Sequence, residues 1–210
     1  MTSRIILLGL WLFPWLASGA PVEREVGNGL VYVRVRTLPA DLPAKTNGRV
    51  APCIIDLRYV ETDGEGATAF GAWLKSRATR RTPVFVIANA DTARPLLKEL
   101  TMQERGAGMV VVGVPRGAFK PDVAVSTSAE DERRAYDALE QGAAIGTLLA
   151  DNPNKVRNDE ASLAPDRPAL PARPSDEPVE SEAKQSSPPI DAALQRAVHL
   201  HRALVALKRL

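Results

Sequence analysis

The sequence predicts an α/β domain in which helices flank a mostly parallel sheet. Residues 52–60 form a short apolar run of the kind found in buried strands, and turn-forming residues follow at 63–66. A helical pattern comes next, and a second unit repeats the theme with a strand at 83–88 and a helix from about Thr92. Two consecutive strand–helix units require parallel strands joined by helical crossovers.

Composition narrows the function classes. The 210 residues are enough for one sizeable domain with appendages, and the net charge of +2 is too small to favour nucleic acid as the main partner. Cys53 is the single cysteine, which excludes an intramolecular disulfide and a cysteine-rich metal site. Because Cys53 lies inside an apolar strand, we expect a buried, inert thiol.

The first 19 residues have the pattern of a signal peptide. Arg4 supplies the positive charge, residues 5–16 are apolar, and Ala17 and Gly19 are small residues at the −3 and −1 positions of a cleavage site. The apolar run is shorter than the roughly 20 residues that span a bilayer. We therefore expect an exported chain, periplasmic or extracellular, that starts at Ala20 and has no stable membrane span. The alternative is an uncleaved N-terminal anchor.

Further elements complete the predicted domain, residues 20–150. The alternating pattern at 29–37 predicts a strand with one well-buried face. Short strands are expected at 109–113 and 122–126, and a helix at 129–149 weakened by Gly142 and Gly146. The basic cluster at 77–81 is interpreted as a solvated helix end, where cations suit the helix dipole.

The remaining chain divides into a linker and a helix. Residues 151–189 hold eight of the seventeen prolines and no aromatic residue, which predicts a disordered linker because so little apolar surface is available for burial. Residues 190–210 form an amphipathic helix that we expect to pack back on the domain, since an isolated helix of this length is marginal in water.

Few residue patterns point directly to a ligand. The loop glycines Gly64 and Gly66 lie between a strand and a helix start, where backbone N–H groups favour anions and oxyanions. His199 and His201 are two residues apart on a predicted helix and point to different sides, so structural histidines are favoured over a metal pair. The sequence predicts no metal site and no cofactor.

Several segments, in this order, resemble the C-terminal processing (tail-specific) serine peptidases, which have ClpP/crotonase-like folds. The matching segments are residues 54–58 (Ile-Ile-Asp-Leu-Arg), the loop 63–66, the strands 83–89, 110–113 and 121–125, and Asp191, Leu194 and Ala197 of the last helix. The resemblance covers residues 29–137 and the last helix. It implies a core of ββα-type units and serine-type peptidase chemistry.

The chain departs from this family at the positions that carry catalysis. Counting back from Gly113, Arg94 stands where the family has its nucleophilic serine, and arginine cannot attack a carbonyl. Phe119 stands at the position of the family's lysine, and Lys120 comes one residue late. Arg94 and Lys120 are thus vestigial positions, while the oxyanion-binding backbone near Gly64 and Gly66 needs no serine. We also expect no counterpart of the family's peptide-tethering PDZ domain between the predicted signal peptide and the first central strand.

Three functional hypotheses follow. The favoured one is a non-catalytic member of the peptidase fold that serves as a protein- or peptide-binding or scaffold module. In such a module Arg94 either pairs with Asp91, Asp63 or Glu65 at the surface, which is the favoured interpretation, or binds a peptide C-terminal carboxylate. The second is an active hydrolase with displaced residues, namely Thr92, Ser126 or Ser128 acting with Lys120. The third is a partner-binding protein that works through its last helix.

Overall fold

The computed structural model describes residues 22–43, 51–79, 81–102, 108–149 and 189–210. The predicted signal peptide, and the predicted linker apart from Pro189, lie outside these residues. In chain order the elements are β1 (Val22–Gly27), β2 (Leu30–Arg34), β3 (Cys53–Asp56), α1 (Gly64–Arg77), β4 (Val84–Ile87), α2 (Arg94–Met102), β5 (Met109–Gly113), β6 (Val123–Ala124), α3 (Ala129–Glu140), α4 (Ile145–Leu148) and α5 (Ala192–Ala206).

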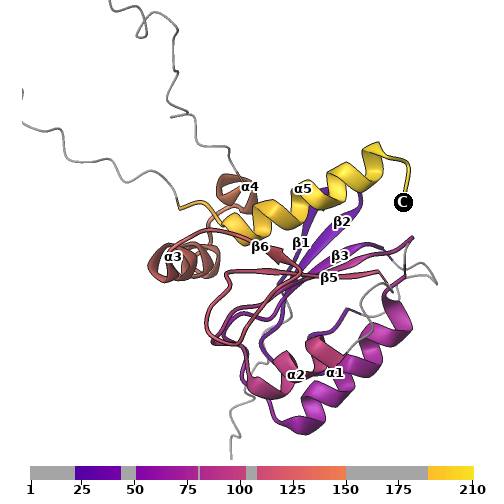
Figure 1. The fold of residues 1–210 in the computed structure, drawn as a ribbon. Coiled ribbons are helices and arrows are strands. Elements are labelled where there is room, and N and C mark those ends of the chain that lie inside the picture. The colour runs from indigo at the N-terminus through magenta and orange to yellow at the C-terminus, as the bar shows by residue number, and fades with distance from the viewer. Residues whose placement is uncertain (1–21, 44–50, 80, 103–107, 150–188) are drawn as a thin grey trace, which may run out of the picture.

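These elements form three layers around one sheet. The described strands follow the order β1-β2-β3-β4-β5-β6; β1 and β2 are antiparallel, and the other neighbouring strands are parallel. Helices α1 and α2 cover one face of the sheet, and α3, α4 and α5 lie on the other (Figure 1). The predicted class, α/β with a mostly parallel sheet flanked by helices, is therefore confirmed.

The N-terminal hairpin differs from the sequence prediction. Both faces of β2 are buried, because Leu30 and Tyr32 pack under the α5 side while Val33 and Val35 pack under the α1 side. The prediction of one well-buried face was wrong. β1, which the sequence reading missed, pairs with β2 across a tight turn in which Asn28 and Gly29 both have positive φ.

Two predicted elements are shorter in the structure. The run at 52–60 contains β3 only as far as Asp56, after which the chain turns and Tyr59 adopts a φ of 59°. The expected helix at 129–149 is interrupted, since Gly142 has a φ of 93° and separates α3 from α4. Glycine adopts such backbone angles without steric cost, so it breaks the helix there.

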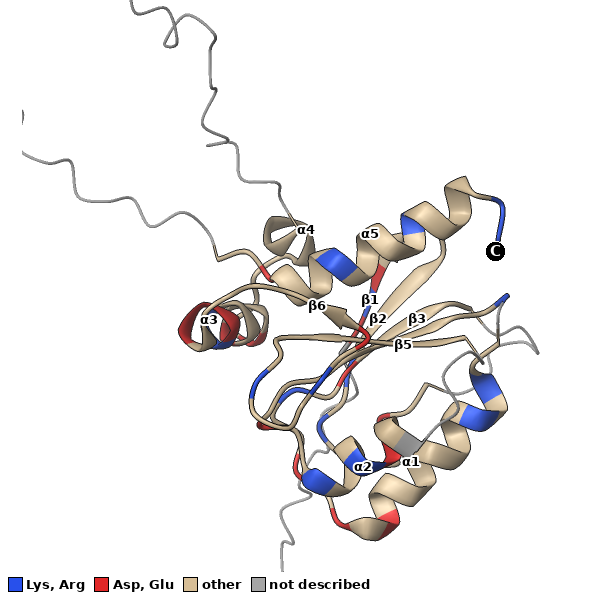
Figure 2. Cartoon of the chain, in the orientation of Figure 1, with Lys and Arg blue, Asp and Glu red and all other residues tan. Residues whose placement is uncertain are grey.

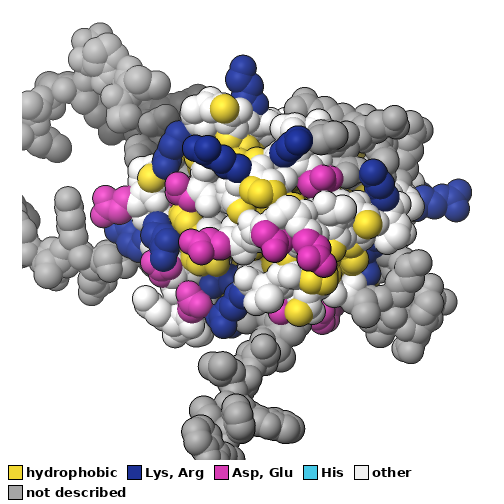
Figure 3. All heavy atoms as spheres, turned by 90° about the horizontal axis from the view of Figure 1, so that it is seen from below, with side chains coloured by type: hydrophobic (Ala, Val, Ile, Leu, Met, Phe, Trp, Pro, Cys, Tyr) yellow, Lys and Arg dark blue, Asp and Glu magenta, His cyan; other side chains and the backbone are white. Residues whose placement is uncertain are grey.

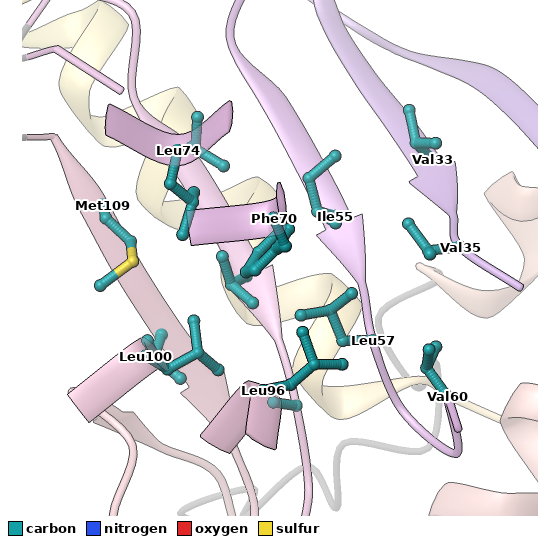
Figure 4. Packing of buried hydrophobic residues seen from close by; sticks show 14 of the residues in the cluster. Val33, Val35, Ile55, Leu57, Val60, Phe70, Leu74, Leu96, Leu100 and Met109 are labelled. Carbon is teal, nitrogen blue, oxygen red and sulfur yellow. The ribbon is translucent and has the colours of Figure 1, made fainter. Parts of the chain in front are cut away.

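The larger core lies between the sheet and the α1–α2 layer. Figure 4 shows side chains of the sheet strands, such as Ile55 and Met109, facing Phe70 and Leu74 of α1 and Leu96 of α2. Fully burying an aliphatic or aromatic side chain contributes roughly 1.5–3 kcal/mol, so this layer supplies much of the driving force for folding. Cys53 belongs to it and is 1% exposed, and burial raises the pKa of its thiol, as expected for an inert cysteine.

The end of α1 corrects the interpretation of the basic cluster at 77–81 for Arg77, whereas Arg81 is exposed as expected and residue 80 lies outside the described residues. Arg77 is 6% exposed rather than solvated. Its Nη1 donates to the carbonyl oxygen of Pro43 at 3.1 Å, and its guanidinium lies 5.3 Å from the ring centre of Trp73. Arg77 thus fastens the helix end to the segment before residue 44.

Helix α5 closes the opposite face. Its buried side consists of Ala193, Leu194, Ala197, Val198 and His201, which pack on the sheet near β4 and β5. Leu200 and Leu204 are half-buried beside them. The buried His201 ring meets Phe85 edge-on at 6.3 Å, whereas His199 is exposed.

Candidate functional site

Two charged regions lie at or near the carboxyl ends of the parallel strands, where α/β proteins usually bind ligands. One is a fully buried ion-pair cluster that joins β3 to α5. The other is an open pocket beside α2. Their chemistry differs, and the difference decides which of them is the better candidate.

The buried cluster, here called the clamp, consists of Asp56, Arg58 and Asp191. The Arg58 guanidinium makes two hydrogen bonds to each carboxylate: its Nη2 lies 2.6 Å from Asp56 Oδ2 and 2.7 Å from Asp191 Oδ2, while Nε and Nη1 reach the other oxygens at 3.0 and 3.2 Å. All three side chains are at most 3% exposed. Asp191 also caps α5, because its Oδ1 accepts a hydrogen bond from the N–H of Leu194 at 3.0 Å.

Neighbouring groups complete the clamp's hydrogen bonding. The Tyr32 hydroxyl donates to Asp56 Oδ2 at 2.8 Å. Arg34 donates to the backbone oxygen of Tyr136 at 2.6 Å, and its guanidinium lies 3.8 Å from the centre of the same tyrosine ring. The Tyr32 bond ties β2 to the clamp, and the Arg34 contacts join β2 to α3, whose Tyr136 ring centre also lies 5.3 Å from the Arg58 guanidinium.

The charges of the clamp stabilise one another. Burial alone raises the pKa of Asp56, but the charge and hydrogen bonds of Arg58, together with the Tyr32 hydroxyl and the Arg34 charge, hold that pKa below its ordinary value. Burial likewise lowers the pKa of Arg58, and the Asp191 and Asp56 carboxylates more than reverse the effect. Because the three side chains are paired with one another and shielded from solvent, we interpret the clamp as a structural element.

Glu132 of α3 lies at the border of the clamp and is less well paired. It is 4% exposed, its Oε2 lies 3.5 Å from Asn89 Nδ2, and its Oε1 has no hydrogen-bond partner among the described residues. Burial raises the pKa of Glu132, an effect that the Arg58 guanidinium reduces without cancelling. This carboxyl group is therefore poised to be neutral more readily than an exposed glutamate.

The second region, here called the basic pocket, lies between α2 and the segment that follows β5. It has a volume of about 650 Å³. The residues that line it are Ala90, Arg94, Leu97, Lys98, Leu100, Thr101, Val111, Arg116, Gly117, Ala118, Phe119, Lys120 and Asp122. A volume of this size suits a small molecule or a few residues of a peptide.

A short turn forms one wall of the basic pocket. The backbone groups of Arg116 and Phe119 bond to each other, with N···O distances of 3.3 and 3.1 Å, and Gly117 between them has a φ of 58°. The carboxylate of Asp122 accepts a hydrogen bond from the N–H of Val111 at 2.9 Å, which fixes the segment against β5. The wall is thus held by backbone bonds, and its basic side chains extend into solvent.

Positive charge predominates in the basic pocket. Arg94, Lys98, Arg116 and Lys120 are all exposed, and Asp122 is the single acidic residue among the described residues that line it. Figure 2 shows the basic residues on α2. On the outer face of the α1–α2 layer, by contrast, acidic and basic side chains are interspersed with hydrophobic ones (Figure 3). The pocket is therefore suited to an anionic ligand with an apolar part.

The structure brings together two of the four predicted site residues. Arg94 and Lys120 line the same pocket, whereas Gly64 and Gly66 are not among its lining residues. The N–H of Gly66 donates to the Asp63 carboxylate at 2.9 Å, so Asp63 already satisfies this donor at the start of α1. A Cβ atom at Gly66 would collide with the Thr62 hydroxyl, which gives this glycine a steric role.

The alternative nucleophiles lie elsewhere. Thr92 is 2% exposed, and its hydroxyl donates to the Leu57 carbonyl at 3.0 Å and accepts from the N–H of Asn89 at 3.1 Å. Ser128 caps α3 by accepting a hydrogen bond from the N–H of Asp131. Neither these two residues nor Ser126 lines the pocket with Lys120.

Sequence reasoning missed Lys98, Arg116 and the clamp. Lys98 lies four residues after Arg94, so both project from one side of α2, a spacing visible in the sequence. The link between Arg58 and Asp191 spans 133 positions and could be inferred only from the topology.

Other site classes find no support in the described part of the chain. It contains no cluster of three His, Cys, Asp or Glu side chains able to hold a metal ion. Of the described helices, none combines the length and the apolar character needed to cross a bilayer. A scan against protein-family models and a search of curated proteins returned no match to this chain.

Proposed function

We propose that this chain is an exported, non-catalytic domain of the tail-specific peptidase type that binds a peptide or protein C-terminus in the basic pocket. The observation that carries the proposal is the position of Arg94. It stands where the resemblance places the nucleophile, and it lines a pocket with three further basic residues.

Contact between two motifs supports the kinship with tail-specific peptidases and their ClpP/crotonase-like fold. Asp56 and Arg58 belong to the first motif of the resemblance, and Asp191 begins the last one. The three side chains are joined by hydrogen bonds of 2.6–3.2 Å. Motifs far apart in sequence that form one buried cluster are consistent with a shared fold rather than a chance sequence match.

The composition of the pocket supports a non-catalytic role. No described residue that lines it is Ser, Cys or His, and the hydroxyl of Thr101 donates to the backbone oxygen of Lys98 at 2.8 Å. Covalent hydrolysis needs a nucleophile within hydrogen-bond reach of a base. The basic side chains offer charge for binding and no such pair.

The ligand class follows from the pocket's two surfaces. Guanidinium groups bind carboxylates through charge-assisted, often bidentate hydrogen bonds, a role open to Arg94 and Arg116. The apolar side chains of Leu97, Leu100 and Phe119 line the same space and suit a hydrophobic residue of the ligand. A peptide C-terminus ending in an apolar residue offers both groups. Export is also a proposal, because its basis is the signal-peptide pattern of residues 1–19, which lie outside the described residues.

The test is a fluorescence anisotropy titration of a labelled peptide with an apolar last residue and a free carboxylate. The expected result is saturable binding that falls about 10-fold or more in Arg94→Gln, because a hydrogen bond to a charged group contributes roughly 1.5–3 kcal/mol. Lys75→Gln, an exposed change on α1, serves as the matched control and leaves affinity unchanged. Equal affinity in the wild type and Arg94→Gln overturns the site assignment.

A separate assay addresses the hydrolase alternative. The pure protein is expected neither to react with a fluorophosphonate probe nor to cleave an unstructured peptide. Cleavage that disappears in Lys120→Ala overturns the non-catalytic assignment, even if the peptide also binds.

A further inference from the structure

The end of α5 concentrates exposed hydrophobic side chains. Among the described residues, the large hydrophobic side chains that are exposed are Val205, Leu207 and Leu210, at 39%, 67% and 37%. All three fall within six consecutive positions, here called the α5 tip (residues 205–210). Scattered exposed hydrophobic residues are ordinary, whereas a local concentration marks an interaction surface.

The tip is exposed because the buried side of α5 ends at His201. Beyond it, residues 202–210 are exposed apart from the half-buried Leu204. The residues before and within the tip are held in a regular cap: the N–H of Lys208 bonds to the Val205 oxygen and that of Arg209 to the Leu204 oxygen, both at 2.9 Å. The hydrophobic side chains therefore project from an ordered turn.

The backbone of this cap is unusual. The two bonds form a Schellman motif, in which the residue of positive φ is normally glycine. Here that residue is Lys208, with a φ of 53°. The turn therefore carries a lysine side chain at the position where most such caps have a glycine and no side chain.

The charged side chains from Ala192 onward have one sign. From Ala192 to Leu210 the sequence contains no Asp or Glu, and it contains Arg196, Arg202, Lys208 and Arg209. All four are exposed, and none makes an ion pair with another described residue. The tip thus combines projecting apolar groups with two cations, Lys208 and Arg209, that have no ion-pair partner among the described side chains.

We propose that the α5 tip docks on an anionic lipid surface. Such a surface meets cations with headgroup phosphates and accepts short apolar side chains at the boundary of the acyl region, which matches both features. A projecting tip suits this flat, deformable partner, whereas a protein would have to present an acidic, apolar hollow. Three apolar side chains give reversible attachment at the surface. The inference is independent of the basic pocket and of its ligand.

The experiment measures binding of the chain beginning at Ala20, which retains every described residue, to sedimented vesicles. Vesicles of phosphatidylcholine with 30% phosphatidylglycerol are compared with pure phosphatidylcholine. We expect binding to the anionic vesicles that weakens in 0.5 M NaCl, because salt screens exposed charges. Since each basic residue near such a surface contributes about fivefold, Lys208→Gln/Arg209→Gln lowers the partition coefficient about 25-fold.

Two further variants separate the tip from net charge. Lys75→Gln/Arg134→Gln removes the same charge from α1 and α3 and is expected to leave vesicle binding within about twofold. Leu207→Gln/Leu210→Gln keeps the charge and is expected to weaken binding without a change in melting temperature, since both side chains are exposed.

Three results overturn the proposal. The first is equal binding to neutral and anionic vesicles, and the second is an equal loss in the α1/α3 variant and the tip variant. The third is no vesicle binding together with self-association that the tip variant abolishes, which assigns the tip to a second copy of the chain.

Discussion

The clamp and the basic pocket contain similar charged side chains, but those of the clamp are buried and paired with opposite charges, whereas the basic side chains of the pocket are exposed. In the clamp, two carboxylates surround Arg58, and the three groups are at most 3% exposed. In the pocket, four basic side chains face solvent beside the single described acid, Asp122. Buried charges whose partners come from the same chain hold the fold together, while exposed charges without such partners remain available to a ligand.

The largest effect is expected when the clamp loses one partner. Asp191→Ala leaves Arg58 with one carboxylate and removes the cap of α5, and breaking a buried ion pair typically costs about 3–5 kcal/mol. Urea denaturation measures the change in unfolding free energy. Asp137→Ala, which removes an exposed pair with Arg133, is the control and should cost at most about 1 kcal/mol. Equal losses in the two variants contradict a structural role for the clamp.

The apolar contact beside the clamp comes next. Leu194 is fully buried under α5, so Leu194→Ala should lower the unfolding free energy by about 2–5 kcal/mol through lost burial and a residual cavity. Leu207→Ala, in the exposed tip, is the matched change and should stay within about 0.5 kcal/mol. If Leu194→Ala changes the unfolding free energy as little as Leu207→Ala does, α5 does not pack on the sheet in solution.

Glu132 gives a smaller effect with a defined pH dependence. Its pKa is raised in the folded state by burial, so its contribution to stability is greatest below its ordinary value of 4.5 and is lost as pH rises through the raised value. Glu132→Gln removes this titration and should stabilise the neutral-pH protein by on the order of 1 kcal/mol, because no carboxylate is then buried. Urea denaturation of the wild type and the variant at pH 4 and pH 7.5 measures both the pH dependence of the unfolding free energy and the stabilisation at neutral pH. A variant as pH-dependent as the wild type excludes Glu132 as the source.

The smallest effect on stability is expected in the pocket. Arg94 is exposed, so Arg94→Gln should leave the unfolding free energy within about 0.5 kcal/mol while it removes ligand affinity. Thermal denaturation checks the first part. A loss above about 2 kcal/mol would show that Arg94, like Arg58, is part of the scaffold.

Much of the fold was accessible from the sequence because its signals are local. The strands β3, β4 and β5 are short apolar runs, and the capping and turn residues around α1 and α2 are visible in the chain. β1 was missed because its central residues Glu23, Arg24 and Glu25 are charged, although Asn28-Gly29 is a hairpin signal. The backbone hydrogen bonds to β2 stabilise β1 as a strand although its residues are polar.

The site was less accessible because its partners are distant in sequence. Counting from Gly113 selected Arg94 and Lys120, which do lie in one pocket. Arg116 was not selected, because nothing local shows that the turn that contains it faces α2. The glycines at 64 and 66 were selected for a free helix N-terminus, yet Asp63 caps that end with its own carboxylate.

The most direct test of the account is a cycle of peptide affinities. The labelled peptide is titrated with its C-terminus free and amidated, against the wild type and against Arg94→Gln. If Arg94 binds the terminal carboxylate, amidation weakens binding to the wild type about 10-fold or more and leaves binding to Arg94→Gln nearly unchanged, because the lost carboxylate and the lost guanidinium are partners. An equal loss on amidation in both proteins would contradict the claim that Arg94 binds the terminal carboxylate.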